Sequence, residues 1–332
     1  MRILLSHGSG GRLTRELIEK KLLPQFKNPI LEKLDDSASL EIKGKIAFTT
    51  DSYVVKPIFF PGGDIGKLSV SGTINDLAML GAEPLYLSLS LIIEEGLELE
   101  KLEKILTSIK ETAEEAGVKI VTGDTKVVRK EEADEIFINT SGIGTIPEDV
   151  NISGSNTKPG DLIILSGYIG EHGIAVMSQR EGISFSGDIK SDVAPLNSLV
   201  KDMLKASKNI HSMRDPTRGG LGTALNEIAK SSKVGIEIYE EKIPVREEVL
   251  GACEMLGIDP LYVANEGKLI ATAPKEDAEK ILEAMRKNPK GKNSQIIGRA
   301  TEENKGKVIM ITKIGSRRII HTPAGELLPR IC

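Results

Sequence analysis

The chain has 332 residues, of which 39% are hydrophobic and 28% charged, a composition typical of a globular protein with two domains or one large one. A net charge of -4 without a basic block, together with 3% aromatic residues and no Trp, argues against nucleic-acid binding. Two cysteines cannot form a disulfide framework, and no apolar stretch resembles a signal peptide or a membrane span, so we expect a cytoplasmic protein without a membrane partner.

The first half of the chain predicts mixed strands and helices. Leu13, Leu17, Ile18 and Leu22 recur at helical spacing, and Pro24 marks the expected end of that helix. Strands are predicted over 39–42, 45–50, 85–93, 119–122 and 135–146, and helices over 65–80 and 97–116. The polar stretch 147–160, rich in Gly, Ser, Asn and Pro, is the expected domain boundary.

The second half predicts strands over 161–166, 235–239, 268–273 and 307–313, and helices over 195–207, 221–231, 246–256 and 275–287. After residue 315 the chain is predicted to be extended, because Pro323 and Pro329 discourage a helix. We therefore expect an α+β protein with an N-terminal domain over 1–150, a C-terminal α/β domain over 151–314 and a flexible tail over 315–332.

The two cysteines occupy different settings. Cys253 lies in an apolar helical stretch with Val249, Leu250 and Leu256, which predicts a core position. Cys332 is the last residue, so no following residues can bury its thiol. A terminal cysteine is either a chance small hydrophobe or a reachable, reactive thiol, and composition alone does not separate these readings.

Aspartates recur in short motifs flanked by Gly or Thr. Each motif alone is most simply a helix cap or a turn, whereas five in one chain favour a site where Mg²⁺ holds nucleotide phosphates. The motifs are Asp35-Asp36, Thr49-Thr50-Asp51, Asn75-Asp76, Gly123-Asp124-Thr125 and Asp215-Pro216-Thr217-Arg218-Gly219-Gly220.

Other nucleotide and catalytic motifs are missing from the sequence. It has no Walker loop, no dinucleotide-binding glycine motif after a strand and no hydrolase nucleophile elbow, and its four histidines are too scattered for structural zinc. Gly8-Ser9-Gly10-Gly11 before a helix is a weak candidate for a phosphate cradle. By elimination, the sequence indicates ATP bound through Mg²⁺ by a fold without a Walker loop.

Taken together, the motifs resemble the HypE family of hydrogenase maturation factors over essentially the full length. The segments that carry the resemblance are His7-Gly8-Ser9-Gly10-Gly11, Asp35-Asp36-Ser37-Ala38, Thr49-Thr50-Asp51-Ser52, Pro61-Gly62-Gly63, Gly123-Asp124-Thr125-Lys126-Val127-Val128, Arg214-Asp215-Pro216-Thr217-Arg218-Gly219-Gly220, Ala264-Asn265-Glu266-Gly267-Lys268 and the terminal Pro329-Arg330-Ile331-Cys332. Ser37 departs from the family's commoner alanine. Aminoimidazole ribonucleotide synthetase, selenophosphate synthetase and thiamine-monophosphate kinase belong to the same superfamily of ATP users.

The resemblance implies a two-domain PurM-like fold and a homodimer in which the N-terminal domains form a shared β-barrel. It implies that a carbamoyltransferase, HypF, loads a carbamoyl group onto Cys332, and that ATP then drives its dehydration to a thiocyanate. The cyano group would pass to a HypC–HypD complex and become a cyanide ligand of the iron in [NiFe] hydrogenase.

The resemblance also implies roles for individual residues. Asp36, Asp76 and Asp215 would ligate Mg²⁺, and Asp76 would thereby also bind the nucleotide. The nucleotide phosphates would be held by Asp51, Gly123, Asp124 and Thr125, with His7 and Lys67 as hydrogen-bonding or cationic partners.

A general base is needed to remove the two amide protons, and the family motifs suggest Glu266 or Lys126. Lys126 could act as a base only if its pKa were lowered; as a cation it would instead bind the leaving phosphate. Glu266 could also be an ordinary loop carboxylate. Two other functions stay open at this point: a synthetase of the same superfamily acting on a free small molecule, and a non-enzymatic scaffold that binds nucleotide.

Overall fold

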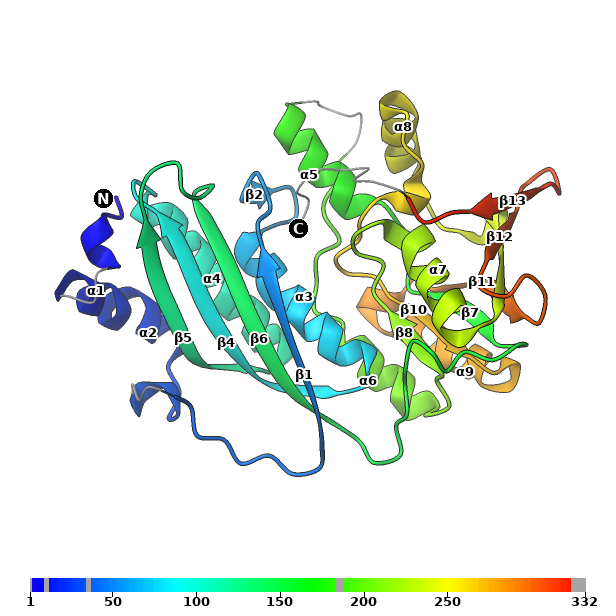
Figure 1. Cartoon of the computed structure of the whole chain (residues 1–332), viewed down its shortest axis with the longest axis horizontal. Coiled ribbons are helices and arrows are strands. Elements are labelled where there is room, and N and C mark those ends of the chain that lie inside the picture. The colour runs from blue at the N-terminus through cyan, green and yellow to red at the C-terminus, as the bar shows by residue number, and fades with distance from the viewer. Residues whose placement is uncertain (1, 9–11, 34–36, 183–187, 324–332) are drawn as a thin grey trace.

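The computed structural model describes residues 2–8, 12–33, 37–182 and 188–323, which form two α+β domains side by side (Figure 1). Asp36, Cys332 and the Ser9-Gly10-Gly11 part of the glycine loop lie outside the described residues.

The N-terminal domain is built on an open sheet with one face covered by helices. Its strands β1 (Lys45–Tyr53), β4 (Glu83–Glu94), β5 (Lys119–Val128) and β6 (Ile136–Ile146) are ordered β1-β6-β4-β5. Helices α3 (Ile65–Met79) and α4 (Leu99–Ala116) pack on one face, and alternate residues of β6 are buried against them (Figure 1). Short elements complete the domain: η1 (Leu5–His7), α1 (Arg12–Leu17), η2 (Ile18–Leu22), α2 (Leu23–Phe26), η3 (Leu31–Lys33), β2 (Phe59–Phe60) and β3 (Gly63–Asp64).

The C-terminal domain contains a larger mixed sheet. The described strands run in the order β13-β12-β9-β11-β7-β10-β8, and all neighbours are antiparallel except β12 and β9. The strands are β7 (Leu162–Leu165), β8 (Ser212–Arg214), β9 (Gly235–Tyr239), β10 (Ile270–Ala273), β11 (Gln295–Thr301), β12 (Val308–Ile311) and β13 (Arg317–Ile320). The helical elements are α5 (Glu171–Glu181), α6 (Asn197–Ala206), α7 (Gly220–Ser232), η4 (Glu240–Lys242), α8 (Glu247–Leu256), η5 (Pro260–Tyr262), α9 (Lys275–Lys287) and η6 (Pro289–Gly291).

A shared apolar core joins the two domains. Leu77 and Met79 of α3 belong to the same buried cluster as Leu199 and Met203 of α6 and Ile164 of β7. Because α3 is buried along nearly its whole length, it is a common wall between the domains. Polar groups that face each other across this contact are therefore held at fixed separations.

Most of the predicted elements are confirmed, including the long helices α3 and α4 and the strands β4, β6, β7 and β9. The end predicted at Pro24 is wrong, because helical structure continues to Phe26. A π-helical turn, η2, runs directly into α2, and Pro24 is the second residue of α2, so the chain stays helical past the proline where the π-turn has widened the helix. The strand predicted at 39–42 is also wrong: that segment pairs with none of the described strands and buries no apolar face.

The flexible tail predicted from residue 315 is wrong for its first part. Arg317–Ile320 forms β13, which pairs antiparallel with β12 at the edge of the sheet. The reason is that Ile320 has a buried place to fill, against Gly222 of α7, and its carbonyl oxygen accepts a 3.0 Å hydrogen bond from Asn226 Nδ2. Residues 324–332 lie outside the described part.

The described residues contain neither a closed barrel nor a membrane-spanning helix. Neither sheet closes into a barrel within the one chain, so the shared barrel of two protomers stays a prediction. Among the described helices, none combines the length and the apolar character needed to cross a membrane.

Candidate active site

Four carboxylates from distant parts of the sequence line one cavity of about 210 Å³ between the domains. Asp51 comes from β1, Asp76 from α3, Asp215 from the loop after β8 and Glu266 from the loop before β10. Arg218 is the cation among the lining residues, which also include Thr50, Ser52, Tyr53, Gly72 and Thr217. The structure thus brings together three of the aspartates and the glutamate that the sequence analysis singled out.

Helix α3 starts and runs where it does for identifiable local reasons. Asp64 caps its N-terminus by accepting hydrogen bonds from the N–H groups of Gly66 (2.7 Å) and Lys67 (3.0 Å). Further along, a side chain at Gly72 would put its Cβ 2.3 Å from the Tyr53 hydroxyl, so only glycine lets β1 approach this closely. The close approach brings Thr49 of β1 to Asp76 of α3, where the Thr49 hydroxyl donates to Asp76 Oδ2 at 2.8 Å.

The electrostatics of the cavity favour protonated acids in the absence of a cation. Burial, followed in size by the negative charge of Asp76, raises the pKa of Asp215 to about 7. Burial also raises the pKa of Asp76, and Asp51 adds to this, while Thr49, Arg214 and Arg218 act in the opposite direction. The pKa of Glu266 lies well above its usual range because of burial and then the charges of Asp215, Asp192 and Asp51.

These residues fit a hard divalent cation that arrives with phosphates. Carboxylate oxygens are the ligands that Mg²⁺ prefers, and the mutual repulsion of these acids would be relieved by a positive charge. Within the ranges that the structure describes, no three acidic, His or Cys side chains are already gathered around one point in the manner of a metal site. Mg²⁺ usually takes only one or two protein carboxylates plus substrate phosphates and water, so Asp76 and Asp215 are sufficient in number.

The Gly123-Asp124-Thr125-Lys126 segment lies in a different cavity, of about 420 Å³, at the edge strand β5. Apolar side chains from the N-terminal helices and from β4 and β5 form much of its wall, among them Leu22, Phe26, Leu89 and Ile120. Lys126 Nζ contacts Asp124 Oδ1 at 2.9 Å, and this hydrogen bond lowers the pKa of the Asp124 carboxyl.

The two cavities lie at opposite ends of one row of strand partners. Asp51, Thr140, Leu89 and Gly123 are successive partners in one row across β1, β6, β4 and β5. Three strand spacings separate the ends of this row, which places Asp51 and Gly123 roughly 14 Å apart. The residues predicted to hold the phosphates are therefore divided between the two ends of a row rather than gathered at one point.

His7 and Lys67 line neither cavity. The His7 ring is buried, and its Nδ1 lies 3.0 Å from the Leu4 nitrogen and 3.3 Å from the Leu4 oxygen, which is a structural role at the start of the chain. Lys67 Nζ donates to the Gly62 carbonyl oxygen at 3.3 Å beside the β2–β3 turn.

Three residues of the site were not given roles by sequence reasoning. Thr217 and Arg218 line the acidic cavity, and the Asp-Pro-Thr-Arg motif was the signal that could have found them. Asn75 joins the domains: its Nδ2 donates to the carbonyl oxygens of Ala194 (3.1 Å) and Glu266 (3.3 Å), and its Oδ1 accepts from Leu196 N–H. The Asn75-Asp76 motif was noted for its aspartate, and nothing in it indicates that Asn75 bridges the domains.

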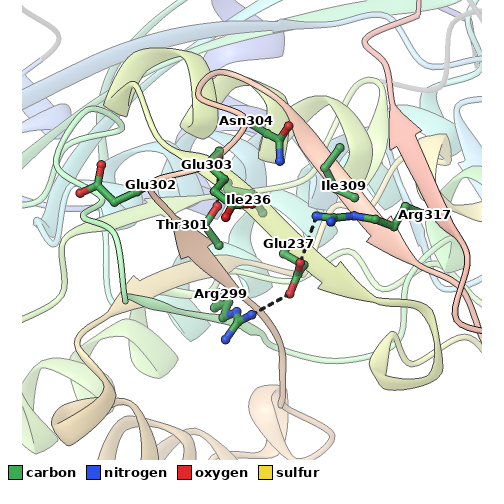
Figure 2. A pocket seen from close by; sticks show the side chains of 9 residues that line it. All are labelled: Ile236, Glu237, Arg299, Thr301, Glu302, Glu303, Asn304, Ile309 and Arg317. Carbon is green, nitrogen blue, oxygen red and sulfur yellow. Dashed lines mark hydrogen bonds and ion pairs between the residues drawn. The ribbon is translucent and has the colours of Figure 1, made fainter.

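A separate depression over the C-terminal sheet contains none of the predicted site residues. Figure 2 shows Glu237 between two arginines, at 3.1 Å from Arg299 and 3.5 Å from Arg317. Arg318 in turn lies 2.6 Å from Asp259. These arginines of β11 and β13 thus pair with acidic side chains of their own domain.

Cys253 is confirmed as a core residue. It is buried in a cluster with Ile174, Val249 and Val263, and burial raises the pKa of its thiol to about 12. At neutral pH it is protonated, and a buried protonated thiol is a poor nucleophile.

Comparisons with known proteins agree with both domains. Residues 34–146 match the family described as AIR synthase related protein, N-terminal domain, and residues 158–311 match the corresponding C-terminal domain. The chain is 51% identical to the carbamoyl dehydratase HypE of Azotobacter vinelandii, over 98% of this chain and 96% of that protein.

Solved structures of HypE resemble this chain over most or all of its length. One is the crystal structure of the hydrogenase maturation protein HypE in complex with ATP, with a TM-score of 0.96 and 49% identity over 99% of both chains. Another is a HypE–HypF complex, with a TM-score of 0.82 and 51% identity over 92% of this chain and 99% of that one.

Proposed function

Since this chain belongs to the HypE family of carbamoyl dehydratases, we propose that it uses ATP to dehydrate a carbamoyl group carried on the Cys332 thiol to a thiocyanate. The observation that carries the proposal is the acidic cavity, where Glu266 lies buried beside Asp51, Asp76 and Asp215. This arrangement offers a proton acceptor next to a site for phosphate-bound Mg²⁺, which are the two requirements of the reaction.

The chemistry removes the elements of water from an amide. The carbamoyl oxygen attacks the γ-phosphorus of ATP, the bond to ADP breaks, and the oxygen becomes part of a phosphate ester. The nitrogen then loses both protons, the C–O bond breaks, and inorganic phosphate leaves as the C≡N bond forms. ATP thus becomes ADP and phosphate, and no oxidant or reductant is needed.

We assign the proton transfer to Glu266 rather than Lys126. Glu266 is buried in the cavity with the carboxylates, and its raised pKa makes it the stronger proton acceptor once ionised. Lys126 is well exposed, pairs with Asp124 and lies in the other cavity, which suits contact with a phosphate.

ATP would use both cavities. The apolar cavity beside β5 suits the adenine base, and the phosphates would extend toward Asp51, Asp76 and Asp215. Asp76 and Asp215, with Asp36, are the residues that would hold Mg²⁺, which when bound neutralises charge on the transferred phosphoryl group.

The tail starts from a place that suits delivery of Cys332. Ile320 packs against α7, the helix that follows Arg218. The backbone of the next residue, His321, contacts Tyr262, which stands four residues before Glu266 in the sequence. From there, the remaining chain could span at most about 40 Å when fully extended. We propose that this reach brings the thiol to the acidic cavity and also presents it to another protein.

Partner proteins and a second protomer complete the proposal. A HypF-type carbamoyltransferase would load the thiol, consistent with the related HypE–HypF complex, and a HypC–HypD complex would receive the cyano group. The helix-free face of the N-terminal sheet carries exposed Ile46, Phe48 and Ile92, and suits a homodimer in which two such sheets face each other.

Substitution of Glu266 tests the assignment. We expect Glu266→Gln to bind ATP and accept the carbamoyl group normally but to stall before loss of water, as measured by mass spectrometry of the C-terminal peptide. Glu254→Gln, an exposed carboxylate of α8 in the same domain, is the matched control and should react like the wild type. Normal thiocyanate formation by Glu266→Gln would disprove the role of Glu266.

A further inference from the structure

The Glu266 loop is bonded to one buried carboxylate from another part of the chain. Asp192 Oδ1 accepts the Glu266 N–H at 3.1 Å, and Asp192 Oδ2 accepts the Gly267 N–H at 3.1 Å. The Lys268 ammonium donates to the same Oδ2, also at 3.1 Å, and the Asp192 side chain is 1% exposed. Asp192 therefore binds three consecutive residues of the loop.

The surroundings of Asp192 keep it ionised. Burial by itself would raise the pKa of its carboxyl, but Lys268, His172 and the Glu266 N–H together hold that pKa below the usual range. Hydrogen bonds to an ionised acceptor are the stronger kind, so the two backbone N–H groups are firmly held. Lys268 is itself held from the other side by Glu171, at 3.4 Å.

The same loop is attached to the other walls of the acidic cavity. The next residue back, Asn265, donates from its backbone N–H and from Nδ2 to the Pro216 carbonyl oxygen, which directly follows Asp215. The Glu266 carbonyl oxygen accepts from Asn75 Nδ2, one residue before Asp76. The loop is thus bonded through Asn265 to the segment beside Asp215 and through the Glu266 carbonyl to the segment beside Asp76, while Asp192 accepts the Glu266 N–H.

The loop and the Asp192 backbone are in close steric contact at Gly267. A Cβ at Gly267 would lie 1.8 Å from the Asp192 carbonyl oxygen, so the loop lies directly against the Asp192 backbone. A small displacement of segment 192–194 would move Glu266 relative to Asp215. Misplacement of a general base by a fraction of an ångström to one ångström is enough to slow proton transfer strongly.

We infer that Asp192 is a positioning residue that holds the Glu266 loop in place for the dehydration step without touching the reacting atoms itself. The inference rests on the proposed role of Glu266 as the base. It predicts a defect confined to the dehydration step, because Asp192 lines neither cavity and so contacts neither the nucleotide nor the site that would hold Mg²⁺.

The test uses the isosteric Asp192→Asn. The amide has the shape of the carboxylate, but its NH₂ group must face either the Glu266 N–H, in place of Oδ1, or both the Gly267 N–H and the Lys268 ammonium, in place of Oδ2, donor against donor. We expect single-turnover dehydration of the carbamoylated full-length protein to slow by at least about tenfold, with the ATP Kd and the carbamoylation rate within about twofold of wild type. Asp188→Asn is the matched control: it makes the same substitution four residues earlier, at an exposed carboxylate that pairs with Lys190.

A double substitution separates positioning from a general loss of structure. If Asp192 acts through Glu266, the Asp192→Asn, Glu266→Gln protein is no slower than Glu266→Gln alone, whereas independent structural damage would multiply the two defects. Wild-type dehydration by Asp192→Asn, or multiplicative defects, would overturn the inference. If Glu266→Gln itself dehydrates normally, the base assignment has failed instead.

Hydrogen exchange of the unmodified protein gives a readout that does not depend on any variant folding. The amides of Glu266 and Gly267 are bonded to a buried carboxylate, so we expect peptides covering 264–268 to exchange slowly. Exchange as fast as in an exposed loop would contradict the inference.

Discussion

Asp76 on α3 and Asp215 on the loop after β8 line the same cavity although they belong to different domains, and the charge of Asp76 helps to raise the pKa of Asp215. The relationship depends on the interdomain core that fixes α3 against α6 and β7. A site built in this way exists only when both domains are folded and packed together.

Because of that raised pKa, the stability of the ligand-free protein should depend on pH through Asp215. Its pKa is about 7 in the folded protein and near 4 in an unfolded chain, so between these values only the folded protein keeps the proton. The stabilisation is fully present below about pH 4 and is lost as pH rises through about 7. Asp215→Asn cannot ionise, so above pH 7 it should be more stable than wild type by up to about 4 kcal/mol.

Chemical denaturation at pH 4.5 and pH 8 measures this difference. Asp149→Asn, which removes an exposed carboxylate, is the control and should follow the wild-type pH dependence. The opposite sign, with Asp215→Asn less stable than wild type at pH 8, would show that Asp215 is ionised and paired in the folded protein.

The open face of the N-terminal sheet should carry the dimer. Phe48 is 66% exposed and lies on the same face as Ile46, so Phe48→Glu would place a charge in the proposed contact. We expect sedimentation velocity to show a dimer for wild type and a monomer for Phe48→Glu. Met255→Glu, at a 75% exposed residue of α8 in the other domain, should remain dimeric. A wild-type monomer at micromolar concentration would refute the dimer.

Two Gly→Ala substitutions should act in opposite directions. At Gly267 the added Cβ would lie 1.8 Å from the Asp192 oxygen, so Gly267→Ala should destabilise the protein by about 3 kcal/mol and displace Glu266. At Gly251, inside α8, an added Cβ meets nothing within 4 Å, and Gly251→Ala should stabilise by up to about 1 kcal/mol. Thermal unfolding measures both; equal stability of the two variants would mean that the loop is loosely packed.

The sequence predicts an element correctly where one face of the element is buried and the other is exposed. The apolar stripe of α4 and the alternation in β6 arise from one buried face, and both elements are confirmed. Helix α5 was missed because His172 to Val176 are all buried, which removes the helical period. Strand β13 was missed because its burial comes from a partner helix, α7, about 100 residues earlier in the sequence.

For the site, the motifs predicted the residue types but not how they are grouped. Nothing in the sequence indicates that Asp51, Asp76, Asp215 and Glu266 share a cavity while the Gly123 segment lies in another, because that division is made by the sheet and the domain contact. Asp192 stands in no motif at all. Its role depends on backbone hydrogen bonds to a distant loop, which leave no pattern in the sequence.

The central claim is that the Cys332 thiol carries the carbamoyl group through dehydration, and mass spectrometry of the cysteine peptides tests it most directly. After incubation with a carbamoyl donor enzyme and ATP, the C-terminal peptide should gain one carbamoyl group and then lose one water, while the Cys253 peptide stays unmodified because that thiol is buried with a pKa of about 12. Modification at Cys253, or dehydration that proceeds in a protein lacking Cys332, would contradict the account.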